Sequence, residues 1–185
     1  PMNLEVLAHF VNTVLQPLLI GEDPLDVDKL WNAMLLRTYK LGPHGVQPGA
    51  MVGVGIALWD ILGKVTGLPI YTLLGGSYRD RIKMYCSIGG GAPMTPDEMV
   101  SKVDDALNAG FRATKIRMDW GPHRRDSDPA KDMAMFTAVR KFVGDDIPLS
   151  FDANNGYSVS TAIRQGCQFE AMNIYHFEEP VAQYD

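Results

Sequence analysis

The sequence is poor in the features that mark secreted, nucleic-acid-binding and membrane proteins. Only two of its 185 residues are cysteine, and Cys86 and Cys167 form no spaced motif, which predicts reduced thiols in a cytoplasmic protein. The formal net charge is −5 and no basic run is longer than a pair such as Arg124-Arg125, so no nucleic-acid partner is expected. No secretory signal opens the sequence. The longest apolar candidate, Met51 to Leu62, is too short to cross a bilayer and contains Asp60, so no membrane association is expected.

What the sequence does contain is enough apolar material for a folded core, since 46% of its residues are hydrophobic. Residues 1–76 show helical patterns and no strand pattern. The predicted helices are an amphipathic helix over 3–15, a helix that starts at Asp23-Pro24, an apolar helix over 50–65 and a short helix over 69–74, and a loop is predicted over 41–49. The 50–65 helix is apolar nearly all round and is expected to be buried between other elements.

From residue 77 onward the pattern alternates between strand and helix. Strands are predicted over residues 83–88, 112–118, 147–153 and 173–177. The intervening helices begin at a capping box, Thr95 to Glu98, at Asp128-Pro129 and at Ser158. Three strand–helix units followed by a fourth strand predict a parallel sheet of the α/β class, with a domain boundary near residues 77–82.

Acidic residues stand at the carboxyl ends of two of these strands. Asp152 ends the third strand and Glu178 ends the fourth, which places both carboxylates at the carboxyl edge of the sheet, where parallel α/β folds keep their sites. Two carboxylates there form half of an oxygen-ligand site for a hard divalent cation. Because alternate residues of a strand share a face, Asn154 is expected beside Asp152, and only one of Glu178 and Glu179 can join the site.

Two cations are predicted on the same face of the second strand, Lys115 and Arg117. Taken singly, each of these residues has a plainer interpretation. A lone Lys or Arg is usually a surface or salt-bridge residue, Asp-Ala-Asn-Asn-Gly is a common turn, and paired glutamates before a proline often open a loop. Their recurrence at successive strand ends, in order, favours a site for a metal-bound anionic substrate.

The residues also resemble a known family. The run GVGIALWDILGKVTGLPIYTLLGG (53–76), followed by TKIR, FDANN and FEEP, is similar to the mandelate racemase and muconate-lactonising branch of the enolase superfamily. The resemblance implies the helical part of an α+β capping domain over residues 1–76 and the first half of a TIM (β/α) barrel over 77–185. It also implies Mg²⁺ bound by carboxylates at the third, fourth and fifth strands, a homo-oligomer, and removal of the proton α to a substrate carboxylate through an enediolate.

Carried over by position, Asp152 and Glu178 resemble two of the metal ligands, and Asn154 resembles a residue that hydrogen-bonds beside the metal or the substrate. Lys115 and Arg117 stand where the family has Lys-x-Lys, whose second lysine is a base. Arginine is a poor base, so Arg117 is expected to clamp the carboxylate or to stabilise the enediolate. Lys115 is a candidate base if its cationic neighbour lowers its pKa, although a His-Asp pair on later strands suits that role better.

Three functions follow as hypotheses. We expect the intact protein to be a Mg²⁺-dependent dehydratase of a sugar acid, with a racemase, epimerase or cycloisomerase as the alternative within the superfamily. A closed barrel has eight strands and four are counted here, so the sequence is interpreted as part of a longer protein. On that interpretation, a catalytically silent polypeptide that lacks the third metal ligand is the alternative from another class.

Overall fold

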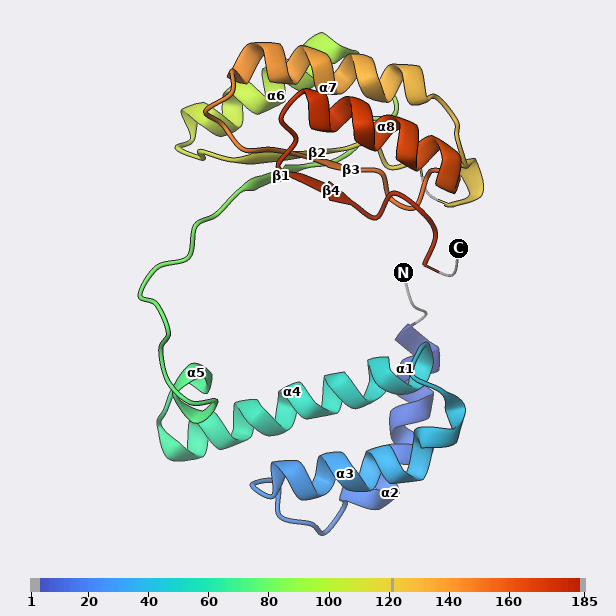
Figure 1. The fold of residues 1–185 in the computed structure, drawn as a ribbon. Coiled ribbons are helices and arrows are strands. Elements are labelled where there is room, and N and C mark those ends of the chain that lie inside the picture. The colour runs from blue at the N-terminus through green and yellow to red at the C-terminus, as the bar shows by residue number, and fades with distance from the viewer. Residues whose placement is uncertain (1–3, 121, 184–185) are drawn as a thin grey trace. The chain divides into compact units, whose positions relative to one another are not determined.

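The computed structural model describes residues 4–120 and 122–183 and divides the chain into two compact units, Pro1–Asp80 and Arg81–Asp185 (Figure 1). The first unit is helical. The second is an α/β unit in which helices cover one face of a parallel sheet. The change of architecture thus follows Asp80, and the sequence places it between residues 77 and 82. Each unit is described by itself.

The helical unit is built from α1 (Leu4–Phe10), a π-helical segment (Val11–Leu15), α2 (Gln16–Leu19), α3 (Val27–Thr38), a 3₁₀ turn (Tyr39–Leu41), α4 (Val46–Thr66) and α5 (Ile70–Leu73). The helix predicted over residues 3–15 therefore continues for another turn. The core of the helical unit combines Leu15 with Met34 of α3 and with Ala50 and Met51 of α4. The short helix predicted before Gly75 is confirmed as α5.

Two helix starts were predicted at the wrong residue. Asp23-Pro24 does not open α3, because the Asp23 carboxylate accepts a hydrogen bond from the Leu25 amide (2.9 Å) and forms a turn, and the helix begins after Asp26. The loop predicted over residues 41–49 is shorter, since α4 already begins at Val46. Pro48 lies in the first turn of α4, where a missing amide hydrogen costs nothing.

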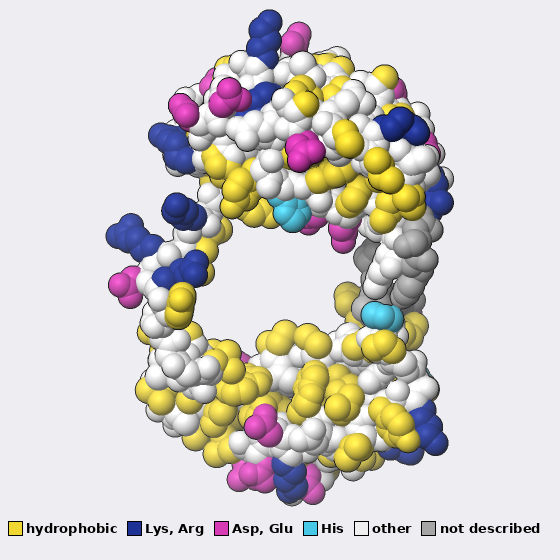
Figure 2. All heavy atoms as spheres, in the orientation of Figure 1, with side chains coloured by type: hydrophobic (Ala, Val, Ile, Leu, Met, Phe, Trp, Pro, Cys, Tyr) yellow, Lys and Arg dark blue, Asp and Glu magenta, His cyan; other side chains and the backbone are white. Residues whose placement is uncertain are grey.

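The expected burial of α4 is wrong within this unit, because several of its apolar side chains, including Val52, Ile56 and Val65, are exposed. Figure 2 shows hydrophobic side chains gathered over the helical unit. The helix also extends beyond Met51–Leu62 at both ends. By length and composition alone, its 21 residues could cross a membrane, a test that core helices of soluble proteins also pass.

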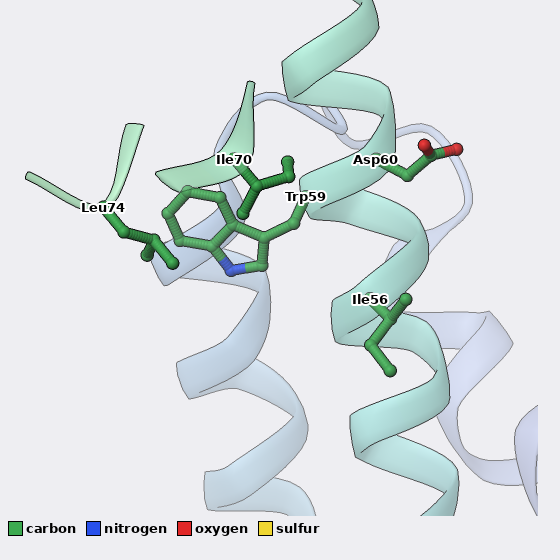
Figure 3. Close-up of a pocket in the computed structure, with 5 residues that line it drawn as sticks. All are labelled: Ile56, Trp59, Asp60, Ile70 and Leu74. Carbon is green, nitrogen blue, oxygen red and sulfur yellow. The ribbon is translucent and has the colours of Figure 1, made fainter. Parts of the chain in front are cut away.

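An apolar pocket of about 340 Å³ lies between α4 and α5 (Figure 3). Ile56 and Trp59 from α4 and Ile70 and Leu74 from the α5 region line it. Asp60 lies at its border and pairs with Lys64 at 2.6 Å. The pocket thus offers no group of polar side chains for chemistry, and the candidate site residues all belong to the second unit.

The α/β unit alternates strands with helices in the predicted order: β1 (Cys86–Ile88), α6 (Pro96–Asn108), β2 (Thr114–Arg117), a 3₁₀ turn (Pro122–Arg124), α7 (Pro129–Val143), β3 (Leu149–Asp152), α8 (Val159–Ala171) and β4 (His176–Glu178). All four strands are parallel and lie in the order β1-β2-β3-β4. The predicted fold class, an unclosed (β/α) half-barrel preceded by a helical part, is confirmed, although each strand is shorter than predicted.

The two faces of this sheet differ in character. The face beneath the helices is apolar: Ile116, Leu149 and Phe151 are buried against α6, α7 and α8, and the Phe151 ring lies 4.8 Å from that of Phe169 on α8. The alternate strand positions, which form the other face of the sheet, carry polar residues. The helix-covered face therefore supplies the hydrophobic stabilisation, which leaves the other face free for charged side chains.

Each helix of the α/β unit begins at the residue that the sequence predicts. Thr95 and Glu98 form the capping box of α6, in which the Thr95 amide donates to Glu98 Oε2 (2.7 Å) and the Glu98 amide donates to Thr95 Oγ1 (3.3 Å). Asp128 caps α7 and Ser158 caps α8 through side-chain oxygens.

Removing the α6 cap should have a modest effect on stability. Thr95→Ala leaves the Glu98 amide without its acceptor and is expected to lower the free energy of unfolding by about 1 kcal/mol. Chemical denaturation followed by circular dichroism measures this, with Ser101→Ala in the exposed middle of α6 as the matched control. Equal stability of the two variants would show that the cap does not contribute.

Candidate metal and substrate site

Strand register brings the predicted residues into two rows on the open face of the sheet. In the strand register, Arg117 of β2 lies opposite Asp152 of β3, and Asp152 lies opposite Glu178 of β4. Two residues earlier on each strand, Lys115 lies opposite Ser150, and Ser150 lies opposite His176. The structure thus assembles Lys115, Arg117, Asp152 and Glu178 at the carboxyl edge, as the strand pattern predicts, although their roles stay a prediction.

Lys115 lies between the two carboxylates. It is only 7% exposed, its Nζ is 3.5 Å from Asp152 Oδ2 and it forms an ion pair with Glu178 Oε2. The ammonium also sits over the ring of Tyr85, 5.6 Å from its centroid. This side chain is therefore a buried cation with two anionic partners.

Burial alone would lower the pKa of Lys115, but the hydrogen bond to Glu178 and the charges of Asp152 and Glu178 outweigh it, so the pKa is raised. The sequence offered Lys115 as a base only on the condition that its cationic neighbour lowers its pKa. The structure reverses that direction, because the groups nearest the ammonium are carboxylates and not Arg117. In this arrangement Lys115 keeps its proton and supplies positive charge.

Asp152 is 3% exposed and both of its oxygens are engaged. Oδ2 faces Lys115, and Oδ1 accepts a hydrogen bond from the backbone amide of Asn154 (2.9 Å). The turn that supplies this amide is unusual, since Asn154 and Asn155 both have positive φ, 49° and 60°. Asparagine tolerates this left-handed conformation better than most residues.

The turn changes the position expected for Asn154. β3 ends at Asp152, so strand alternation does not extend to Asn154 and cannot place it on the same face. The structure nevertheless keeps the residue next to Asp152 through its backbone. Its side-chain Oδ1 is buried and has no hydrogen-bond partner among the described residues. A buried amide oxygen without a donor is a free ligand for a cation or a substrate hydroxyl.

Glu178 and Glu179 separate, as their adjacent positions require. Glu178 pairs with Lys115, whereas Glu179, at φ 42°, accepts a hydrogen bond from Asn155 Nδ2 (3.1 Å). His176 is exposed and lines an open cavity of about 890 Å³ over the polar face of the sheet, together with Lys115 and Glu178.

These donors fit part of a Mg²⁺ site. Asp152 and Glu178 supply two carboxylates in register, and Asn154 supplies the unpaired oxygen, all of which are hard ligands suited to this ion. Within residues 4–120 and 122–183, no group of three or more His, Cys, Asp or Glu side chains could hold a metal. The two carboxylates would therefore be incomplete as a first coordination shell.

The sequence analysis did not single out two acidic residues near the site. Asp119 forms an ion pair with Arg117, and Asp132 is a buried carboxylate behind the site. Asp132 of α7 is fully buried, and its two oxygens accept hydrogen bonds from Trp120 Nε1 (2.8 Å) and from the Tyr157 hydroxyl (2.5 Å). Trp120 follows β2 and Tyr157 follows the Asn154 turn, so Asp132 ties both rim segments to α7. The only sequence signal was an acid in the first turn of a helix, which usually marks no more than a favourable dipole contact.

Comparison with known proteins identifies both parts of the chain. Residues 3–75 match the family described as the mandelate racemase/muconate lactonizing enzyme N-terminal domain, and residues 98–185 match the enolase C-terminal domain-like family. Together the two matches cover the helical unit and most of the α/β unit.

Three curated relatives are similar in sequence. The L-talarate/galactarate dehydratase of Salmonella typhimurium is 35% identical over 90% of this chain, and the arabinonate dehydratase of Saccharolobus solfataricus is 33% identical over 92%. The D-galactarolactone cycloisomerase of Agrobacterium fabrum is 35% identical over 88%. The chain spans 40%, 44% and 42% of the lengths of these relatives, in that order.

A solved structure agrees with the sequence relatives. The mandelate racemase/muconate lactonizing protein from Paracoccus denitrificans, crystallised in complex with magnesium, is 43% identical with a TM-score of 0.91. The match covers 97% of this chain and 48% of that protein. The chain therefore belongs to the mandelate racemase and muconate-lactonising branch of the enolase superfamily.

Proposed function

We propose that this protein takes part in the Mg²⁺-dependent removal of a proton α to a carboxylate, and that the reaction is the dehydration of a sugar acid. The observation that carries the proposal is the row Arg117–Asp152–Glu178 at the carboxyl edge of the sheet, with Lys115 buried beside it. Two of the similar proteins are named as sugar-acid dehydratases, which supports the choice of reaction.

In this proposal Asp152 and Glu178 would hold the Mg²⁺, which when bound supplies Lewis-acid stabilisation of negative charge on substrate oxygens. Arg117 binds the substrate carboxylate, because a guanidinium offers two parallel donors to a planar anion. Lys115 keeps a positive charge next to the oxygens on which the enediolate charge develops. Dehydration then removes the α-proton and the β-hydroxyl, which together leave as one water.

A cycloisomerase is the second candidate, favoured by the similarity to the D-galactarolactone enzyme. The two reactions differ in their product, since dehydration loses one water and cycloisomerisation conserves mass. Incubation with a panel of sugar acids and their lactones, followed by mass spectrometry of the products, distinguishes them. Conversion without loss of water would overturn the dehydratase proposal.

Mg²⁺ binding tests the site directly. Asp152→Asn keeps the shape of the side chain but removes one of two ligand charges, and is expected to weaken Mg²⁺ binding at least about tenfold. Calorimetric titration of the purified chain measures this, with Asp104→Asn on the exposed face of α6 as the control. No binding heat from the unsubstituted chain would favour the alternative that the chain alone is catalytically silent, and equal affinity in both variants would exclude Asp152 as a ligand.

A further inference from the structure

The guanidinium of Arg117 is held from two strand ends at once. Its Nε lies 2.5 Å from Asp119 Oδ1, and the other carboxylate oxygen of Asp119 accepts a hydrogen bond from the backbone amide of Gly90. Asp119 therefore links the end of β2, which carries Arg117, to the segment that follows β1. One carboxylate fixes both the cation and the neighbouring backbone.

The backbone at Asp119 has an uncommon conformation, with a φ of 62°. A side chain with a Cβ costs about 1 kcal/mol or more in this region, and such strain persists where surrounding contacts compensate for it. Here the compensating contacts are those of the carboxylate itself. The strained turn directs the Asp119 side chain back toward Arg117 rather than onward along the strand.

Glycine at the end of β1 provides the space for the guanidinium. A Cβ added to Gly89 would lie 2.7 Å from Arg117 Nη2 and 3.2 Å from Cζ, closer than side-chain atoms pack. Gly91 is similarly constrained, since its amide donates to the Arg117 carbonyl (3.0 Å) and a Cβ would lie 2.8 Å from that oxygen. The glycine run after β1 thus lets Arg117 lie flat against the neighbouring backbone.

We propose that Asp119 is a positioning residue that locks the Arg117 guanidinium over Gly89 and so presents a fixed, planar binding site to a substrate carboxylate. This inference rests on the proposed function, because it assigns the ligand of that site. It also accounts for arginine in place of the second lysine: an immobilised fork recognises a planar anion, whereas a lysine would offer a mobile point charge. The unit acts as a whole, with Gly89 for space, Asp119 for orientation and Arg117 for binding.

This pair differs from an ordinary surface salt bridge, which contributes little. The side chains of Arg117 and Asp119 are 41% and 34% exposed, but the Nε atom of Arg117 is itself buried and has no hydrogen-bond partner among the described residues, so Asp119 holds it as an ion pair and not through an aligned hydrogen bond. The end of the guanidinium that faces Asp119 is thus shielded, while the side chain as a whole keeps solvent access. A carboxylate ligand can approach without displacing the aspartate.

Nuclear magnetic resonance of the arginine Nε–H groups tests the positioning role on the chain itself. Arg117→Lys assigns the Arg117 signal by removing it. Asp119→Ala is expected to speed hydrogen exchange at Arg117 Nε at least about tenfold, because the guanidinium loses the ion pair that keeps this atom buried. Gly89→Ala, which places a Cβ against Nη2, should shift the same signal, whereas Asp104→Ala on α6 should change neither property.

Titration with sodium tartrate, a small hydroxy-dicarboxylate, then probes binding. The Arg117 signal of the unsubstituted protein is expected to shift with tartrate, and Asp119→Ala to weaken that response about tenfold. Unchanged exchange in Asp119→Ala, with circular dichroism showing a folded chain, would overturn the positioning role. Faster exchange without any tartrate response in the unsubstituted protein would support the positioning role and contradict the carboxylate site of the proposed function.

Discussion

Replacing Arg140 by methionine is expected to lower the free energy of unfolding by about 3 kcal/mol, because four backbone carbonyls lose the donor that they share. Arg140 of α7 is 8% exposed. Its guanidinium donates to the carbonyls of Gly144 (2.6 Å) and Ile147 (3.0 Å) before β3, and to those of Met172 (3.1 Å) and Asn173 (2.8 Å) before β4.

These contacts make Arg140 the tie between two loops at the amino-terminal edge of the sheet. No carboxylate among the described residues lies within ion-pair distance of it, and burial lowers its pKa. The charge is instead compensated by carbonyl dipoles and by the Phe136 ring, 5.9 Å from the guanidinium carbon. Losing the side chain therefore frees both loops that lead into the strands carrying Asp152 and Glu178.

Two companion variants separate charge from geometry. Lys141→Met, on the exposed side of the same helix, should change stability by no more than about 0.5 kcal/mol. Arg140→Lys keeps the charge but cannot reach four carbonyls, so it should be nearly as destabilising as methionine. Urea denaturation of the three variants measures this. A lysine variant as stable as the original protein would show that charge alone, without the fork, holds the loops.

Local rules predicted the α/β unit well because its elements depend on neighbouring residues. Thr95, Asp128 and Ser158 begin helices in the structure as their side chains predict, and the alternation of Lys115 and Arg117 with Ile116 separates the polar face from the core. The same rules failed where a competing local bond exists. Asp23 forms a turn with Leu25 instead of capping α3, which nothing in the spacing of the residues distinguishes.

The site was predictable in membership but not in geometry. Asp152 and Glu178 could be placed at one edge from strand ends alone, since parallel strands share that edge. The ion-pair partners of Lys115 could not be predicted in this way. They are carboxylates 37 and 63 positions away along the chain, and their contact with Lys115 depends on the register of three strands. Asp119 was missed, and Asn154 was named but its placement by strand alternation was wrong, for another reason: both residues adopt positive φ, which ends strand alternation at that point.

Asp132→Ala is expected to destabilise the protein by about 2–4 kcal/mol, since it leaves the half-buried Trp120 indole N–H and the buried Tyr157 hydroxyl without an acceptor. Asp132→Asn keeps the side-chain shape and one oxygen for Trp120, so its effect should be smaller. Asp104→Asn, on the exposed face of α6, is the control for a general change in charge. An alanine variant as stable as this control would show that water replaces the lost carboxylate.

The pH dependence of stability tests the state of this buried carboxyl. Burial raises the pKa of Asp132 even though its two hydrogen-bond donors oppose the shift, and burial together with the Asp132 charge raises the pKa of Tyr157, which therefore stays a donor. With a folded pKa above the unfolded one, the unfolded chain loses its proton first as the pH rises above about 4. The stability of the original protein relative to Asp132→Asn should then fall with rising pH, through the interval up to the folded pKa, and level off beyond it. Denaturation series at several pH values measure this difference in stability. A relative stability that increases with pH would mean that the hydrogen bonds from Trp120 and Tyr157 stabilise the ionised carboxylate more than burial destabilises it.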